Sequence, residues 1–226
     1  MFIGHWAPAF AAAAYSKRAP KLGTLFIAGQ LVDWGFFALA TVGVEHMRIE
    51  PGATAMNPLD LYHMPYTHSL LGSAIWAIAF VVVLLLARRE LTTALIGGLV
   101  VLSHWFVDLL VHRPDLTFAG GDSKIGFGIW NYPAIAIALE LGITLAAFLW
   151  YVRKTKGPVM PPWILLALLL AMQSINWFGP EPQSAGIGLY LTALASFGIA
   201  AWVASWVGTT RRHISDRGLA GASPPR

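Results

Sequence analysis

Three residues that could bind a metal ion or catalyse a reaction lie at regular spacing in one apolar segment. The segment 91–112 reads LTTALIGGLVVLSHWFVDLLVH and places His104, Asp108 and His112 four residues apart. On a helix such residues share one face, so these side chains form a stripe that rises about 12 Å. An imidazole nitrogen and a carboxylate oxygen on one face can bind the same ion. The alternative is a hydrogen-bonded pair that seals a contact between two helices.

A second histidine pair precedes another apolar segment. Residues 63–69 read HMPYTHS, in which the proline predicts a turn and the Thr or Ser can cap the helix that follows. This helix and the one carrying His104 form a predicted hairpin, so His63 and His68 are expected on the same side as His104 and Asp108. Solvated loop histidines would explain His63, but they explain His104 poorly.

Two further carboxylates and one histidine lie in apolar surroundings. Asp33 lies in GQLVDWGFFAL, Glu140 in NYPAIAIALELGI and His5 in GHWAPAF. An ionised carboxylate there needs a cation, hydrogen-bond donors or a raised pKa caused by burial. Glu140 is a candidate general base, a partner that orients a ligand or an interhelical hydrogen-bond donor. His5 is a candidate ligand or an interfacial anchor, and Gln173 is assigned to helix contacts.

The elements that must position these residues are membrane helices. Of the 226 residues, 57% are hydrophobic and 12% charged, whereas a soluble domain carries roughly 25% charged residues. The chain has no Cys, which excludes thiolate metal sites and Cys nucleophiles. Six apolar runs approach or exceed the roughly 20 residues that a bilayer requires: 22–44, 66–87, 91–112, 129–152, 162–179 and 184–207.

A shorter apolar run, 2–15, precedes these six. It lacks the basic start and small-residue cleavage site of a signal peptide, so we expect it to be retained as a half-helix or re-entrant segment. The sequence therefore predicts an all-α, polytopic membrane bundle of about six transmembrane helices plus a short N-terminal half-helix. We expect one domain, 1–207, followed by a disordered cytoplasmic tail, 208–226.

The basic residues alternate between the two sides of the predicted bundle. Twelve of the 15 Lys and Arg residues lie in 16–21, 88–90, 153–157 and the tail, and only three in the other connecting segments. The positive-inside rule then makes the first set and the C-terminus cytoplasmic and directs the His and Asp residues outward. Short juxtamembrane clusters set topology and attract anionic lipid, so the net charge of +4 does not indicate nucleic-acid binding.

The order of the motifs resembles a known family. His5, Asp33, a T-H-S element at 67–69 and an S-H-x-x-x-D element at 103–108 are similar to the bacterial inner-membrane predicted metal-dependent hydrolases, the family of the LexA-regulated membrane-bound predicted hydrolase. The resemblance covers roughly residues 1–115. It implies a helical protein of the inner membrane that binds a divalent metal through the matching His and Asp residues, and a loose kinship to zinc-dependent phospholipase C.

Two departures from the family pattern reduce the number of charged groups. The family commonly has Pro-Asp-x-Asp in its first helix, where this chain has Leu31-Val32-Asp33 with one Asp. It commonly has His-Arg at the start of the second element, where this chain has His63-Met64. These departures leave fewer carboxylates and no Arg for a metal cluster.

Our leading hypothesis is a metal-dependent hydrolase. One or two divalent ions, zinc first and manganese or iron as alternatives, would activate water for attack on a lipid-derived ester or phosphoester. The substrate class follows from the depth of the site in the membrane. Asp33 and Glu140 are the candidate catalytic carboxylates. The candidate ligands are His5, Asp33, His63, His68, His104 and Asp108.

Two other functions account for the same residues. In an ion- or proton-coupled transporter, Asp33, Asp108 and Glu140 would relay protons or bind a cation. In a membrane scaffold, the polar side chains would only lock the helices together. The sequence shows no internal repeat, which counts against the transporter.

Overall fold

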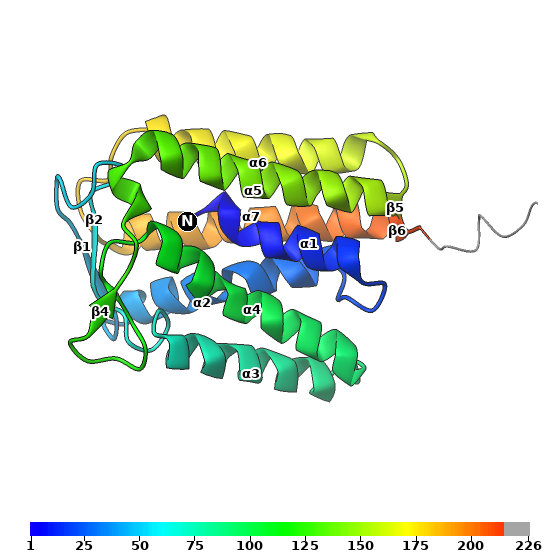
Figure 1. Cartoon of the computed structure of the whole chain (residues 1–226), viewed down its shortest axis with the longest axis horizontal. Coiled ribbons are helices and arrows are strands. Elements are labelled where there is room, and N and C mark those ends of the chain that lie inside the picture. The colour runs from blue at the N-terminus through cyan, green and yellow to red at the C-terminus, as the bar shows by residue number, and fades with distance from the viewer. Residues whose placement is uncertain (215–226) are drawn as a thin grey trace, which may run out of the picture.

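Residues 1–214 are described by a computed structural model, which shows a helical bundle (Figure 1). Within this range the chain forms a 3-10 turn, η1, and seven α-helices, which confirms the expected all-α class. The bounds are η1 Ile3–Trp6, α1 Ala7–Tyr15, α2 Leu22–Thr41, α3 Leu70–Leu86, α4 Leu91–Val111, α5 Pro133–Lys154, α6 Met160–Phe178 and α7 Ile187–Thr210.

Five of these helices, α2, α4, α5, α6 and α7, are long and apolar enough to cross a membrane. Helix α3 is apolar but has 17 residues, so it rises about 26 Å, slightly less than the roughly 30 Å hydrocarbon core. The chain is thus a multi-pass membrane protein, and the six helices correspond to the six predicted runs. Local residue preferences explain where two of the helices begin. Pro133 occupies the first position of α5, and the Ser69 hydroxyl accepts from the Gly72 N–H at the start of α3.

Short antiparallel strand pairs lie at both ends of the bundle (Figure 1). At the end we call the hairpin end, β1 (His46–Ile49) pairs with β2 (Leu59–His63), and β3 (Leu116–Thr117) pairs with β4 (Lys124–Ile125). A second 3-10 turn, η2 (Ile129–Asn131), leads from there into α5. At the other end, β5 (Thr155–Lys156) pairs with β6 (Arg212–His213). Loops 16–21 and 87–90 lie at this second end, which we call the basic end.

Ion pairs fasten the hairpin end to the loop after α4. Asp60 on β2 pairs with Arg48 on β1, at 2.6 Å between Nε and Oδ2, and also with Arg113. The pKa of Arg48 is raised above its ordinary value by its hydrogen bond with Glu50 and by the nearby charge of Asp60. Asp60 therefore links the β1–β2 hairpin to the segment that follows Asp108 and His112.

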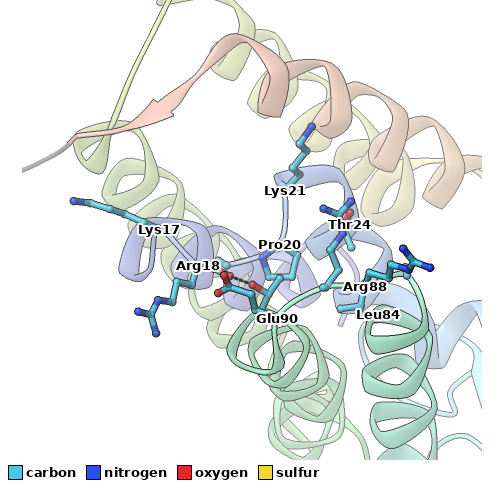
Figure 2. Close-up of a pocket in the computed structure, with 12 residues that line it drawn as sticks. Lys17, Arg18, Pro20, Lys21, Thr24, Leu84, Arg88 and Glu90 are labelled. Atoms are coloured by element: carbon cyan, nitrogen blue, oxygen red, sulfur yellow. Dashed lines mark hydrogen bonds between the residues drawn. The ribbon is translucent and has the colours of Figure 1, made fainter.

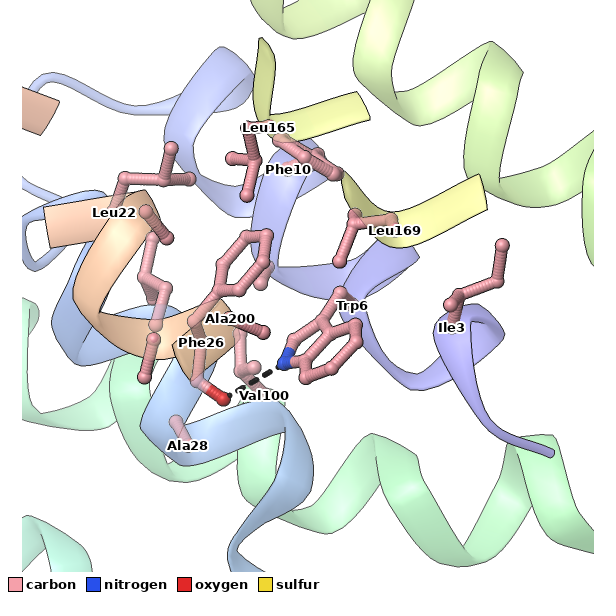
Figure 3. Packing of buried hydrophobic residues seen from close by; sticks show 14 of the residues in the cluster. Ile3, Trp6, Phe10, Leu22, Phe26, Ala28, Val100, Leu165, Leu169 and Ala200 are labelled. Atoms are coloured by element: carbon pink, nitrogen blue, oxygen red, sulfur yellow. Dashed lines mark hydrogen bonds between the residues drawn. The ribbon is translucent and has the colours of Figure 1, made fainter. Parts of the chain in front are cut away.

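The predicted N-terminal half-helix is present and lies inside the bundle (Figure 3). Trp6 and Phe10 are fully buried, and the Trp6 indole donates to the Phe26 carbonyl oxygen at 3.0 Å while its ring stacks on that of Phe26. In a membrane protein such contacts stabilise the packing of helices mainly through van der Waals attraction. Packing of this kind holds η1 in place, so the segment is a core element that also carries His5.

The boundary of the expected C-terminal tail differs from the prediction. Helix α7 continues to Thr210, and Arg212–His213 form β6, so ordered structure runs past residue 208 to residue 214. The reason is Arg211, whose guanidinium donates to the Thr155 carbonyl oxygen at 2.7 Å and to the Pro158 carbonyl oxygen at 2.8 Å. Residues 215–226 of the expected tail lie outside the described residues.

Candidate metal centre

Four ligand atoms from three elements converge at one point near the hairpin end. They belong to Asp33 on α2, His68 just before α3, and His104 and Asp108 on α4, and we call them the His/Asp cluster. From His68 Nε2, Asp33 Oδ1 lies at 3.2 Å and Asp108 Oδ2 at 3.6 Å. From His104 Nε2, the same two oxygens lie at 3.6 Å and 3.1 Å. Two overlapping groups of three could each hold an ion: His5 with His104 and Asp108, and Asp33 with His68 and His104. The four His–Asp distances lie near the roughly 3.3 Å that separates ligands of a tetrahedral zinc ion.

Local structure explains why these side chains meet. His104 and Asp108 lie one turn apart on α4, as the sequence predicts, and α4 packs against both α2 and α3. The close approach of α2 to η1 depends on Gly29, because a Cβ atom at this position would lie 2.6 Å from the His5 carbonyl oxygen. His68 is held by the turn that caps α3. The cluster is therefore assembled by three helices and by the N-terminal turn behind them.

A chain of hydrogen bonds fixes the proton on His68. The Thr67 hydroxyl lies 2.6 Å from Glu45 Oε2 and 2.8 Å from His68 Nδ1. An ionised carboxylate only accepts, so the single Thr67 proton is donated to Glu45, and the Thr67 oxygen accepts from Nδ1–H. In the neutral imidazole, Nε2 then carries a lone pair. That lone pair faces Asp33 and Asp108.

His104 has the same arrangement. Its Nδ1 lies 3.0 Å from the Gly29 carbonyl oxygen, which can only accept, so Nδ1 carries the proton. In the neutral imidazole, its Nε2 carries a lone pair that faces the two carboxylates, whereas in the imidazolium the same atom carries a proton directed at them. Metal-bound histidines commonly donate their other N–H to a carbonyl or carboxylate in this way, which fixes the tautomer and orients the ring.

The cluster is buried and rich in acceptors. His68, His104 and Asp108 are at most 3% exposed, and the Asp33 side chain is 15% exposed. His104 Nε2 and Asp108 Oδ2 lie 3.1 Å apart, yet neither has a hydrogen-bond partner in the described part of the chain. Buried polar atoms without a partner are costly because nothing compensates for lost water. A bound cation would give both atoms a partner, and the neighbouring pair His68 Nε2 and Asp33 Oδ1, 3.2 Å apart, lies close enough to contact it, so these residues fit a divalent metal ion.

His5 lies beside the cluster and contacts the other oxygens of both aspartates. Its Nε2 lies 2.8 Å from Asp108 Oδ1, and its Nδ1 lies 3.5 Å from Asp33 Oδ2. Its ring stacks on the His104 ring at 3.6 Å between centroids. The α-amino group of Met1 also lies 2.6 Å from Asp108 Oδ1. His5 therefore lies within reach of an ion and also holds both carboxylates in position.

Two candidate residues from the sequence lie apart from the cluster. His63 is exposed at the end of β2, where it pairs with His46 of β1. Glu140 is buried on α5, and its Oε1 accepts from the backbone N–H groups of Phe2 and Gly4 at 2.7 and 3.0 Å. Gln173 donates to the other oxygen at 3.3 Å. The structure thus places His63 on the hairpin and Glu140 against the N-terminal turn.

His112, which the sequence placed on the same helix face, and three residues that the sequence did not identify, Asp115, Glu45 and Thr67, support the cluster. His112 Nδ1 lies 2.9 Å from Asp115 Oδ1, and its Nε2 lies 3.4 Å from Asp108 Oδ1. The spacing of His112 and Asp115 by three residues is a usable signal for such a pair. Glu45 and Thr67 are 22 residues apart in a loop region, so no local pattern could connect them.

Comparisons of the chain with protein-family models, curated proteins and solved structures give no match. The fold and the site therefore define the class of protein by themselves. It is a multi-pass, all-α membrane protein with a buried group of His and Asp side chains that could hold a metal ion.

Proposed function

We propose that this protein is an integral membrane hydrolase that depends on a divalent metal ion, zinc by preference. The observation that carries the proposal is the His/Asp cluster, in which two imidazole Nε2 atoms and two carboxylate oxygens face one another at 3.1–3.6 Å. Mixed imidazole and carboxylate ligands suit zinc, and also manganese or iron. The proposal also draws support from the resemblance to predicted hydrolases, which rests on Asp33, the T-H-S element and the S-H-x-x-x-D element.

The chain's own residues would hold and orient the reacting groups. A bound ion of this kind supplies a Lewis acid and a source of hydroxide near neutral pH. Asp33 is the most exposed member of the cluster, and the Gln30 amide donates to its Oδ2 at 2.6 Å. A substrate would thus approach the cluster from the side on which Asp33 lies. There the Asp33 carboxylate would be placed to accept a proton. Glu140 would act at a distance by anchoring the turn that carries His5.

The depth of the cluster favours a lipid-derived ester or phosphoester as substrate. His68 lies two residues before the start of α3, and Asp108 lies three residues before the end of α4. Both positions are near the helix ends, where lipid headgroups meet the hydrocarbon core. If the basic end lies in the cytoplasm, the C-terminus is cytoplasmic as well. The cluster would then lie toward the outer face of the inner membrane. A lipid substrate could then enter without leaving the bilayer.

The structure offers less support for a transporter that relays protons through three carboxylates. Glu140 already accepts two backbone hydrogen bonds and one from Gln173, and these bonds hold the N-terminal turn. A relay through Glu140 would have to break contacts that position His5. Asp108, by contrast, keeps its Oδ2 without a hydrogen-bond partner in the described part of the chain, so this oxygen can face a cation.

Metal analysis of the detergent-purified protein tests the proposal. We expect near-stoichiometric zinc in the wild type and its loss in the double variant His104→Ala, Asp108→Ala. His63→Ala is the matched control, because it removes an exposed histidine outside the cluster and should leave the metal content unchanged. A wild type without tightly bound metal, after growth with zinc, manganese and iron, would contradict the proposal.

A panel of ester and phosphoester lipids then tests the reaction. We expect the metal-loaded wild type to hydrolyse at least one lipid class, and a chelator to abolish this activity. Retained zinc without hydrolysis of any lipid would refute the hydrolase and leave a metal-binding protein. Uptake measured in vesicles under a proton gradient would then test the transporter.

A further inference from the structure

A basic cavity of about 580 Å³ lies at the opposite end of the bundle from the His/Asp cluster (Figure 2). It lies between the loop that joins α1 to α2 and the loop that joins α3 to α4. Glu90 is the one acidic residue among those that line it. Five basic residues line it: Lys17, Arg18, Lys21, Arg88 and Arg89.

All five basic side chains are exposed, and none of them forms a salt bridge within the described part of the chain, although Glu90 lines the same cavity. The salt bridges that Lys and Arg side chains form across residues 1–214 all belong to Arg48 and Arg113, at the hairpin end. Like charges held in one cavity repel one another, and a bound anion relieves that repulsion. The cavity is therefore chemically suited to an anionic ligand.

The backbone holds the two loops of the cavity together. The Thr93 hydroxyl, in the first turn of α4, donates to the Arg18 carbonyl oxygen at 2.7 Å. Arg88 adopts a left-handed backbone conformation with φ of 56°, and its N–H donates to the Leu85 carbonyl oxygen at 2.9 Å. A non-glycine residue in this conformation is uncommon, and here it turns the chain sharply at the end of α3. One wall is thus fixed to the other by the Thr93 side chain, and the loop after α3 is fixed by its own backbone hydrogen bond.

The cavity borders an exposed apolar surface on α3. Leu84 lines it, and the next two residues, Leu85 and Leu86, are 40% and 78% exposed. Val82 and Val83, one turn earlier, are also exposed. A ligand that uses both features needs an anionic head and apolar chains. Inorganic phosphate could use the cations alone.

We propose that this cavity binds the phosphate group of an anionic phospholipid, whose acyl chains lie against the end of α3. Basic pockets between transmembrane helices bind such headgroups, and the Arg guanidinium matches phosphate oxygens in pairs. The proposal is independent of the function proposed for the His/Asp cluster, because it uses other residues at the other end of the bundle.

Native mass spectrometry of the full-length protein in detergent tests this binding. The probes are phosphatidylglycerol, phosphatidylcholine and inorganic phosphate. We expect the wild type to bind phosphatidylglycerol in preference to phosphatidylcholine, and the double variant Arg88→Gln, Arg89→Gln to bind it roughly 30-fold more weakly. The control double variant Arg153→Gln, Lys154→Gln removes the same charge from exposed residues at the basic end of α5 and should bind like the wild type.

The outcomes separate a specific cavity from general charge attraction. Equal losses in both double variants, or no loss in either, would overturn the proposal. Displacement of phosphatidylglycerol by excess inorganic phosphate, with the same dependence on Arg88 and Arg89, would overturn the lipid as the ligand and assign free phosphate instead. A second pair, Lys17→Gln with Arg18→Gln, should reproduce the loss if unfolding of the first variant obscures it.

Discussion

The placement of two imidazole protons determines what the His/Asp cluster can bind. The Thr67 hydroxyl and the Gly29 carbonyl oxygen each accept from an Nδ1–H group, so in the neutral imidazoles both Nε2 atoms of His68 and His104 carry lone pairs. Two carboxylate oxygens face these Nε2 atoms in a buried space. This arrangement of acceptors is the physical reason to expect a cation there.

Thr67 should control metal affinity without touching the metal. Thr67→Val keeps the shape of the side chain but removes the oxygen that accepts from His68 Nδ1–H. We expect metal affinity to fall roughly 10- to 100-fold, as for other partners that orient a metal-bound histidine. The measurement is competition of the purified protein with a zinc-binding dye.

Thr67→Ser is the matched control, because it keeps the hydroxyl and should retain most of the affinity. A Thr67→Val variant with the affinity of the wild type would show that the Glu45–Thr67–His68 chain does not orient the ligand.

At the scale of the elements, some of the site follows from local spacing and the rest does not. The stripe of His104 and Asp108 on α4 was predicted because i, i+4 residues share a helix face whatever surrounds them. Asp33 meets them only because α2 crosses α4 closely, and no pattern within α2 reveals that contact. The prediction of the all-α bundle was secure for a similar reason, since bilayer thickness fixes the length of each apolar run.

The candidates that lie elsewhere show the limits of spacing as a guide. His63 precedes His68 by five residues, which suggested a shared site, but the turn at Pro65 ends β2 and leaves His63 exposed beside His46. Glu140 was expected as a general base, as a partner that orients a ligand or as an interhelical hydrogen-bond donor, and in the structure it accepts hydrogen bonds. Its donors are backbone N–H groups of η1, whose position depends on the packing of Trp6 and Phe10.

Gly29 should be required for the contact between α2 and η1. In Gly29→Ala, the added Cβ would lie 2.6 Å from the His5 carbonyl oxygen. We expect the helices to shift and the free energy of unfolding to fall by about 1–3 kcal/mol. Thermal unfolding in detergent measures this change.

Gly142→Ala is the control, because a Cβ at this exposed position on α5 meets nothing within 4 Å. It should leave stability unchanged or raise it by about 0.5–1 kcal/mol, since glycine is unfavourable within a helix. Equal effects of the two substitutions would mean that the close approach at Gly29 is unimportant.

At the scale of the whole molecule, the two ends of the bundle have opposite chemistry. The hairpin end carries buried acids and histidines, and the basic end carries exposed cations beside a cavity. Helices α2 and α4 connect these ends, since both begin beside the cavity and carry cluster residues further along. This difference between the ends matches the alternation of charge along the sequence. In our proposals the hairpin end hydrolyses a lipid and the basic end binds the phosphate group of one.

If the His/Asp cluster binds zinc, the zinc K-edge X-ray absorption spectrum of the purified protein will report its ligands. We expect about four nitrogen or oxygen ligands at roughly 2.0–2.1 Å, with the outer-shell scattering of two imidazole rings, and loss of this signal in the His104→Ala, Asp108→Ala variant. A spectrum of hydrated or non-specifically bound zinc, or an imidazole signal that the double variant retains, would contradict zinc binding by the cluster.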